Sequence, residues 1–140
     1  MPSIFSRIIA GELPATFVWK DEAAVAFLSI APMMPGHTLV VPREEVDHWI
    51  DLEPELASHL FVVAQTIGRA QDLEWEPRRI GMLIVGEEVP HTHLHVVPIN
   101  NPGELSFAHA DSSPDPAALA DAATRLRARL RELGRSEVAD

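Results

Sequence analysis

The sequence predicts an α+β domain: an antiparallel sheet of about five strands with helices packed on it. The expected strands follow one another mostly through short turns, and the expected helices are grouped instead of alternating with the strands. A doubly wound parallel sheet would need a crossover helix after almost every strand, so it is the poorer interpretation. With 140 residues, 46% of them hydrophobic, the chain can form one core, and we expect a single domain over residues 1–140.

The N-terminal part predicts a short helix followed by three strands. Ser3 has the side chain of a helix N-cap, and Phe5, Ile8 and Ile9 form an apolar side, which predicts a helix over residues 3–9. Runs of mostly β-branched, aliphatic or aromatic residues bounded by turn residues predict strands at 16–20, 24–30 and 37–42.

Two longer helices and a fourth strand are expected in the remainder of the chain. Apolar residues recur at the helical period from Leu56 to about Gln71, which predicts an amphipathic helix. Residues 79–85 predict a strand. Asp115 followed by Pro116 combines an N-cap with a proline at the first helical position, so we expect a last helix from about 115 to 133.

Composition and charge exclude several classes of protein. The chain has no cysteine, which excludes disulfides, thiolate catalysis and cysteine-based metal sites and agrees with a cytoplasmic location. No signal-like run and no stretch of about 18 apolar residues is found, so we expect neither secretion nor a membrane span. The net charge of −10 argues against binding to nucleic acid or anionic membranes, but a local pocket can still hold a small phosphate ligand.

Three of the seven histidines stand at alternate positions in residues 89–98, where β-branched residues and flanking prolines predict a fifth strand. Successive side chains of a strand point to opposite faces, so His91, His93 and His95 are expected on one face. A helix would scatter the three imidazoles around its axis. Three imidazoles in one row are unusual for packing alone.

Three interpretations of this row remain open. The rings could bind a metal ion, as in some enzymes with three histidine ligands, although no further ligand is evident. They could be structural or surface histidines. They could also act at phosphorus, because a neutral imidazole, whose unperturbed pKa is about 6.5, is a good nucleophile near pH 7. In that case the central His93 attacks, while His91 and His95 hydrogen-bond the phosphate or deliver a proton.

Residues 86–98 resemble the signature of the histidine triad (HIT) superfamily, His-φ-His-φ-His-φ-φ with φ apolar, Thr92 being a mild departure. Residues 4–9 with 11–14 are similar to the opening of that family. Residues 26–30 and 35–42 resemble its next two blocks, in the expected order. The match covers roughly residues 3–98.

The resemblance implies a HIT-like fold, no cofactor and a homodimer. It also implies a hydrolase or transferase acting on nucleoside phosphoramidates, dinucleoside polyphosphates or related α-phosphate esters, with a purine nucleotide or similar phosphate compound as ligand. His93 matches the nucleophile that forms a nucleotidyl-histidine intermediate, His91 and His95 match the flanking pair, and His37 matches another histidine near the site. The positions that match the apolar slot for the base are Phe5, Ile8, Phe27 and Ile30.

Departures from the family pattern concern substrate binding. Ser29 stands where many members carry an aspartate that holds the ribose hydroxyls. Glu87 stands where a glutamine commonly donates to the phosphate, and an ionised carboxylate has no such donor and repels an anion. Ser29, Glu87 and the neighbouring Glu88 are nevertheless expected at the substrate site.

Many members also bind a structural zinc through a cysteine pair and a histidine. Ser3 and Ser6 occupy the cysteine positions here and Glu45 stands near the expected histidine, so we expect no such zinc site and no metal. Two rival functions remain: a nucleotide-binding or regulatory module with little turnover, and a metal-dependent enzyme that uses the triad as ligands.

Overall fold

The computed structural model describes residues 1–140 and contains one five-stranded antiparallel sheet in the order β1-β2-β3-β5-β4. Strands β1 to β3 pair with their neighbours in the chain, and β5 lies between β3 and β4. This confirms the predicted antiparallel α+β class. The strands are β1 (Phe17–Lys20), β2 (Ala24–Leu28), β3 (Thr38–Pro42), β4 (Arg79–Leu83) and β5 (Leu94–Ile99).

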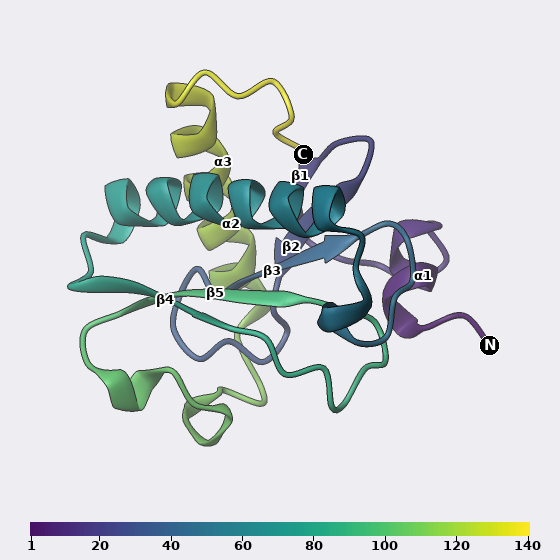
Figure 1. Cartoon of the computed structure of the whole chain (residues 1–140). Helices are drawn as coiled ribbons and strands as arrows, with labels where there is room; N and C mark the ends of the chain where they lie inside the picture. The colour runs from purple at the N-terminus through teal and green to yellow at the C-terminus, as the bar shows by residue number, and fades with distance from the viewer.

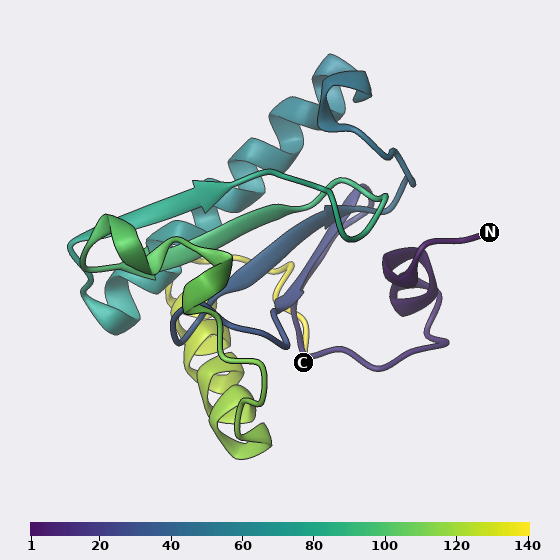
Figure 2. The same cartoon turned by 90° about the horizontal axis from the view of Figure 1, so that it is seen from below.

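The helices divide between two sides of the sheet. The helices α2 (Pro54–Trp75) and α3 (Pro116–Glu132) pack against one face, and α2 runs along it in Figure 1. The short helix α1 (Ile4–Ile9) lies apart from them, beyond the end of the sheet where β3 ends, in Figures 1 and 2. Three short 3-10 helices complete the chain: η1 (Trp49–Asp51), η2 (Pro102–Glu104) and η3 (Phe107–His109). No helix has both the length and the hydropathy needed to cross a membrane.

The two faces of strand β2 contribute side chains to two different hydrophobic clusters. Its alternate residues Ala24, Ala26 and Leu28 join the main core beneath α2 and α3. Val25 and Phe27 point to the opposite face, where they form a smaller cluster with Phe5 of α1. Because side chains alternate along a strand, the same rule applies to β5: Leu94 and Val96 enter the main core, and His95 points to the face that carries the smaller cluster.

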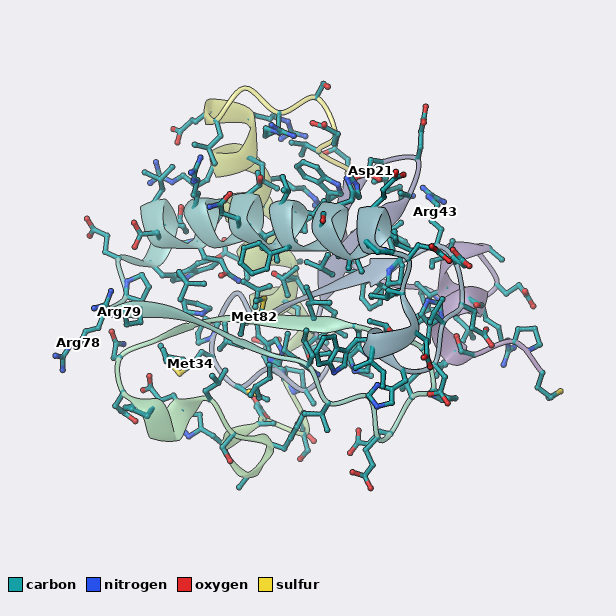
Figure 3. All side chains as sticks on the ribbon, viewed as in Figure 1. Asp21, Met34, Arg43, Arg78, Arg79 and Met82 are labelled. Atoms are coloured by element: carbon teal, nitrogen blue, oxygen red, sulfur yellow. The ribbon has the colours of Figure 1, made fainter.

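The turn between β1 and β2 marks the end of the sheet near α1. Asp21 accepts hydrogen bonds from the backbone N–H groups of Ala23 and Ala24, and Arg43 donates to the Asp21 carbonyl. Figure 3 shows Asp21 and Arg43 at this end, and Arg78 and Arg79 at the opposite end.

The strand predicted over residues 89–98 is wrong at its beginning, because β5 starts only at Leu94. The N–H of Thr92 donates to the Val46 carbonyl over 2.7 Å, so it belongs to a loop contact and not to the sheet. Its hydroxyl donates to the same carbonyl over 2.8 Å. His91 and His93 therefore lie in the loop that precedes β5, and only His95 lies on a strand.

Other boundaries differ by a few residues. The second predicted strand, 24–30, ends at Leu28, and the fourth, 79–85, ends at Leu83. The helix expected to end near Gln71 continues to Trp75, whose ring packs beneath Gly36. Gly36 and Trp75 are far apart in the sequence, so the helical period could not reveal that the helix extends to this contact.

Candidate active site

His37 and His95 form a hydrogen-bonded pair on adjacent segments of the sheet. Leu39 of β3 lies opposite His95 of β5, and Nε2 of His37 is 2.9 Å from Nδ1 of His95. The backbone N–H of Met33 donates to Nδ1 of His37 over 2.9 Å. Nδ1 of His37 is therefore the acceptor nitrogen, and Nε2 carries the proton that it donates to His95. His95 in turn carries its proton on Nε2, which is buried and has no hydrogen-bond partner within the protein.

His93 is held in the opposite tautomer. Its Nδ1 lies 2.7 Å from the carbonyl oxygen of His91, which can only accept a hydrogen bond, so Nδ1 carries the proton. The lone pair of the neutral ring is then on Nε2. The rings of His93 and His95 are 4.9 Å apart between centroids, so this lone pair and the N–H of His95 belong to one site.

His91 is fully buried and uses both ring nitrogens for contacts within the protein. Its Nε2 donates to the Pro42 carbonyl over 2.8 Å, and its Nδ1 accepts from the Ser3 hydroxyl over 2.7 Å. No ring nitrogen of His91 remains for a phosphate. What His91 contributes in this geometry is its backbone carbonyl, which orients His93.

Burial keeps these four histidines neutral. Burial and the neighbouring His95 lower the pKa of His37 to about 3. Burial, with a smaller contribution from His93, lowers the pKa of His95 to about 4. Burial also lowers the pKa of His91 and of His93, and nearby Glu88 opposes the change at His93. A neutral imidazole has one N–H and one lone pair. The hydrogen-bond assignments above, in which each ring has one protonated nitrogen, therefore agree with these lowered pKa values.

Three of the four predicted slot residues gather beside His93. The ring of Phe5 makes edge-to-face contacts with His93, at 4.9 Å between centroids, and with Phe27, at 5.5 Å. Ile8 packs on the same cluster. Ile30 lies outside it and is 81% exposed.

The remaining predicted substrate residues differ in their exposure. Ser29 is buried, and its hydroxyl accepts from the backbone N–H of Ala31. Glu87 and Glu88 are exposed, and Glu88 is near enough for its charge to act on His93.

Sequence reasoning missed Phe107 of η3, whose ring meets that of His95 edge-to-face at 5.3 Å. The helix η3 is a single short turn between β5 and α3, and Phe107 belongs to no motif, so no sequence signal marked it.

The three histidines of the row are not arranged as ligands of one ion. No group of three histidine, cysteine, aspartate or glutamate side chains converges to hold a metal. The position where the family resemblance places a zinc ion holds Ser3, Ser6, Glu45 and His91. Only two of these are ordinary zinc ligands, and Nδ1 of His91 already accepts from Ser3, so the donor set does not fit zinc.

Comparison with known proteins identifies the family of this chain. Residues 10–101 match the family model described as the HIT domain. The chain belongs to the HIT family. This HIT domain is 36% identical to the "Protein hit" of Bacillus subtilis over 106 residues, which cover 72% of this chain and 73% of that protein.

Solved HIT structures show the same fold. A structure described as a Zn-bound histidine triad family protein from Mycobacterium smegmatis is 32% identical, with a TM-score of 0.81 and 94% of each chain covered. A hypothetical histidine triad nucleotide-binding protein from Sulfolobus tokodaii superposes with a TM-score of 0.83, covering 94% of this chain and 93% of that one. Its identity is 22%, so it supports the fold alone.

Proposed function

We propose that this HIT domain is a nucleotide hydrolase or nucleotidyl transferase that acts on the α-phosphate of nucleoside phosphoramidates or dinucleoside polyphosphates. His93 is the nucleophile and forms a covalent nucleotidyl-histidine intermediate. The observation that carries the proposal is the hydrogen bond from Nδ1 of His93 to the His91 carbonyl, because it leaves the lone pair on Nε2.

The reaction has two steps. The Nε2 lone pair of His93 forms a bond to the α-phosphorus, and the bond from phosphorus to the leaving group breaks. The leaving group keeps the electron pair and takes a proton from solvent. The His93 ring becomes cationic, and the His91 carbonyl on its Nδ1–H stabilises that charge. Water then attacks phosphorus, the P–N bond breaks, and a nucleoside monophosphate leaves.

His95 assists at the phosphoryl group. Its Nε2–H is the one donor of the site that no protein atom engages, and it belongs to the ring beside His93. A hydrogen bond from this group to a phosphate oxygen stabilises the charge that develops there. His37 keeps the donor on Nε2 by occupying Nδ1 of His95.

The cluster of Phe5, Ile8 and Phe27 supports binding of a purine base next to His93. Ser29 faces the ribose in this proposal, and Glu87 and Glu88 lie near the phosphates. Their negative charges disfavour polyphosphates, so nucleoside phosphoramidates with an amine leaving group are the better substrates.

Intact-mass spectrometry after a brief mix with an adenosine phosphoramidate tests the proposal. We expect a mass increase of one nucleoside monophosphate group on the wild type, none on His93→Ala, and an unchanged adduct on His48→Ala, which alters an exposed histidine. If neither wild type nor His93→Ala forms an adduct or releases product while both bind nucleotide, the rival interpretation as a nucleotide-binding module is correct.

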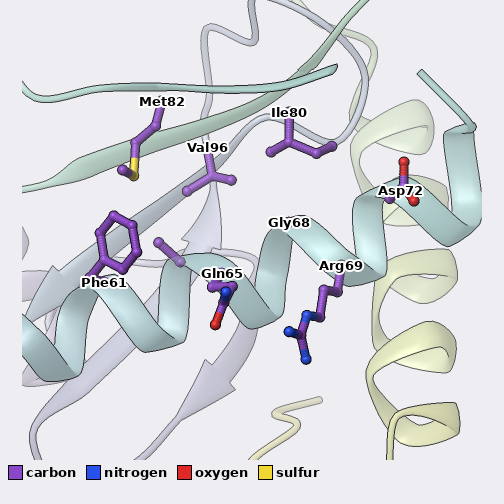
Figure 4. A pocket seen from close by; sticks show the side chains of 9 residues that line it. Phe61, Gln65, Gly68, Arg69, Asp72, Ile80, Met82 and Val96 are labelled. Atoms are coloured by element: carbon purple, nitrogen blue, oxygen red, sulfur yellow. The ribbon is translucent and has the colours of Figure 1, made fainter. Parts of the chain in front are cut away.

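We also propose that two copies pair through β4 and α2. The outer edge of β4 has no partner strand. Beside it lies a groove of about 360 Å³, in which Phe61 and Met82 face each other in Figure 4. Both side chains are exposed in the single chain. Light scattering should give a dimer for the wild type and for Leu133→Glu, which alters an exposed apolar residue at the C-cap of α3, outside the groove. Phe61→Glu should give a monomer, and a monomeric wild type would refute this pairing.

A further inference from the structure

We propose that Ser3, Ser6 and Glu45 form a positioning network that fixes His91 and, through the His91 carbonyl, the ring of His93. Hydrogen bonds occupy the place where the family resemblance puts a zinc ion. The inference rests on the proposed function, because it concerns how the nucleophile is held. The three residues touch no reacting atom and act only through His91.

The directions of the hydrogen bonds in this network follow from its donors. Oε1 of Glu45 accepts from the N–H of Ser3 over 2.7 Å and from the hydroxyl of Ser6 over 2.6 Å. The hydroxyl of Ser3 accepts from the N–H of Ser6 over 3.0 Å. Its single proton is then free to be donated to Nδ1 of His91. The Ser6 hydroxyl also lies 3.5 Å from Nδ1 of His91, but its proton goes to the nearer Glu45. Nδ1 of His91 therefore accepts from Ser3, and the ring has one tautomer.

The same segment also holds the peptide group that orients His93. The His91 carbonyl and the Thr92 N–H belong to one planar peptide unit. That N–H donates to the carbonyl of Val46, the residue after Glu45. Residues 45 and 46 therefore act at two points: Glu45 holds the His91 side chain through Ser3, and Val46 holds the peptide whose oxygen accepts from Nδ1 of His93.

The far side of the His91 ring is held by β3, because Nε2 donates to the Pro42 carbonyl. His91 is thereby clamped between the N-terminus of α1 and a strand of the sheet. Metal coordination by thiolates and imidazole would provide the same clamp, but serine hydroxyls keep their protons at neutral pH and are poor zinc ligands. The network therefore replaces the metal.

The first test follows the Nδ1–H of His93 by NMR in the protein without ligand, together with the rate of adduct formation. We expect Ser3→Ala to increase solvent exchange of this N–H and to lower the adduct rate roughly 10- to 100-fold, the effect of a small misplacement of a reacting group. Ser3→Thr keeps a hydroxyl and should restore both, and Ser112→Ala, at an exposed serine, should change neither.

Ser3→Ala also removes the N-cap of α1, and this loss by itself can change the His93 signal. Ser6→Ala therefore provides a second variant. It leaves the Ser3 cap in place and removes one bond to Glu45, and it should change the His93 signal in the same direction. An unchanged His93 signal in both variants overturns the network. An enzyme that forms no adduct overturns the proposed function, while the NMR comparison still decides the network.

The second test rebuilds the metal site. The triple variant Ser3→Cys/Ser6→Cys/Glu45→His presents two thiols and two imidazoles, including His91, which is a common zinc set. Elemental analysis after dialysis against zinc should find one zinc per triple-variant chain and none per wild-type chain. A chelator should disturb the His93 signal of the zinc-loaded triple variant and leave the wild type unchanged. Zinc bound stoichiometrically by the wild type, or none bound by the triple variant, would overturn the inference.

Discussion

Acid should destabilise this protein through the His37–His95 pair. In the unfolded chain each ring takes up a proton near its ordinary pKa of 6.5, whereas the folded protein holds these pKa values at about 3 and about 4. Between pH 6.5 and pH 4 the unfolded state therefore binds more protons than the folded state. The free energy of unfolding has its full value above about pH 7 and falls as the pH is lowered through this window.

The magnitude follows from the unfolded state. At pH 5 both folded rings are neutral, so each histidine lowers the free energy of unfolding by RT ln(1 + 10^1.5) relative to pH 8, about 2 kcal/mol. For the pair this gives about 4 kcal/mol. The result does not depend on how far below pH 5 the folded pKa values lie.

Urea unfolding at pH 8 and at pH 5, at constant ionic strength, measures the effect. The double variant His37→Gln/His95→Gln should lose about 4 kcal/mol less between the two pH values than the wild type. His48→Gln, which alters an exposed histidine, should follow the wild type. A double variant with the same pH dependence as the wild type would show that the folded rings are not held neutral, and the tautomer assignment would fail with it.

Two further predictions concern Gly36 and Phe107, whose contacts with Trp75 and His95 no sequence pattern revealed. Gly36→Ala should destabilise the protein by about 2–4 kcal/mol in urea unfolding, because a Cβ there lies 2.5 Å from the Trp75 ring and the residue has a φ of +89°. Gly11→Ala shares the positive φ but meets no atom within 4 Å, so an equal loss in both variants would contradict the packing argument. Phe107→Ala should lower stability by less than about 1.5 kcal/mol, because its ring is half exposed, and should speed exchange of the His95 Nε2–H in NMR. Unchanged exchange would mean that Phe107 does not cover this group.

The regular elements could be predicted because their signals are local. The run of strand-forming residues in β2 and the helical period of α2 lie within the segments themselves, and both elements were predicted within a few residues of their bounds. The sequence did not predict the start of β5 or the contact of Phe107 with His95, because residues far along the chain determine both. The Val46 carbonyl takes the N–H of Thr92 out of the sheet, which places His91 and His93 in a loop. Phe107 reaches His95 only through the folding of a loop that has no periodic pattern.

The sequence by itself determined the family, the antiparallel α+β class and the presence of three closely spaced imidazoles without thiols. The tertiary structure decided which nitrogen of each ring is free. That choice depends on hydrogen-bond partners far along the chain: Ser3 is 88 residues from His91, Pro42 is 49 residues from it, and His37 is 58 residues from His95. An imidazole has two nitrogens of nearly equal basicity, so only a donor or acceptor fixed in space can select one of them.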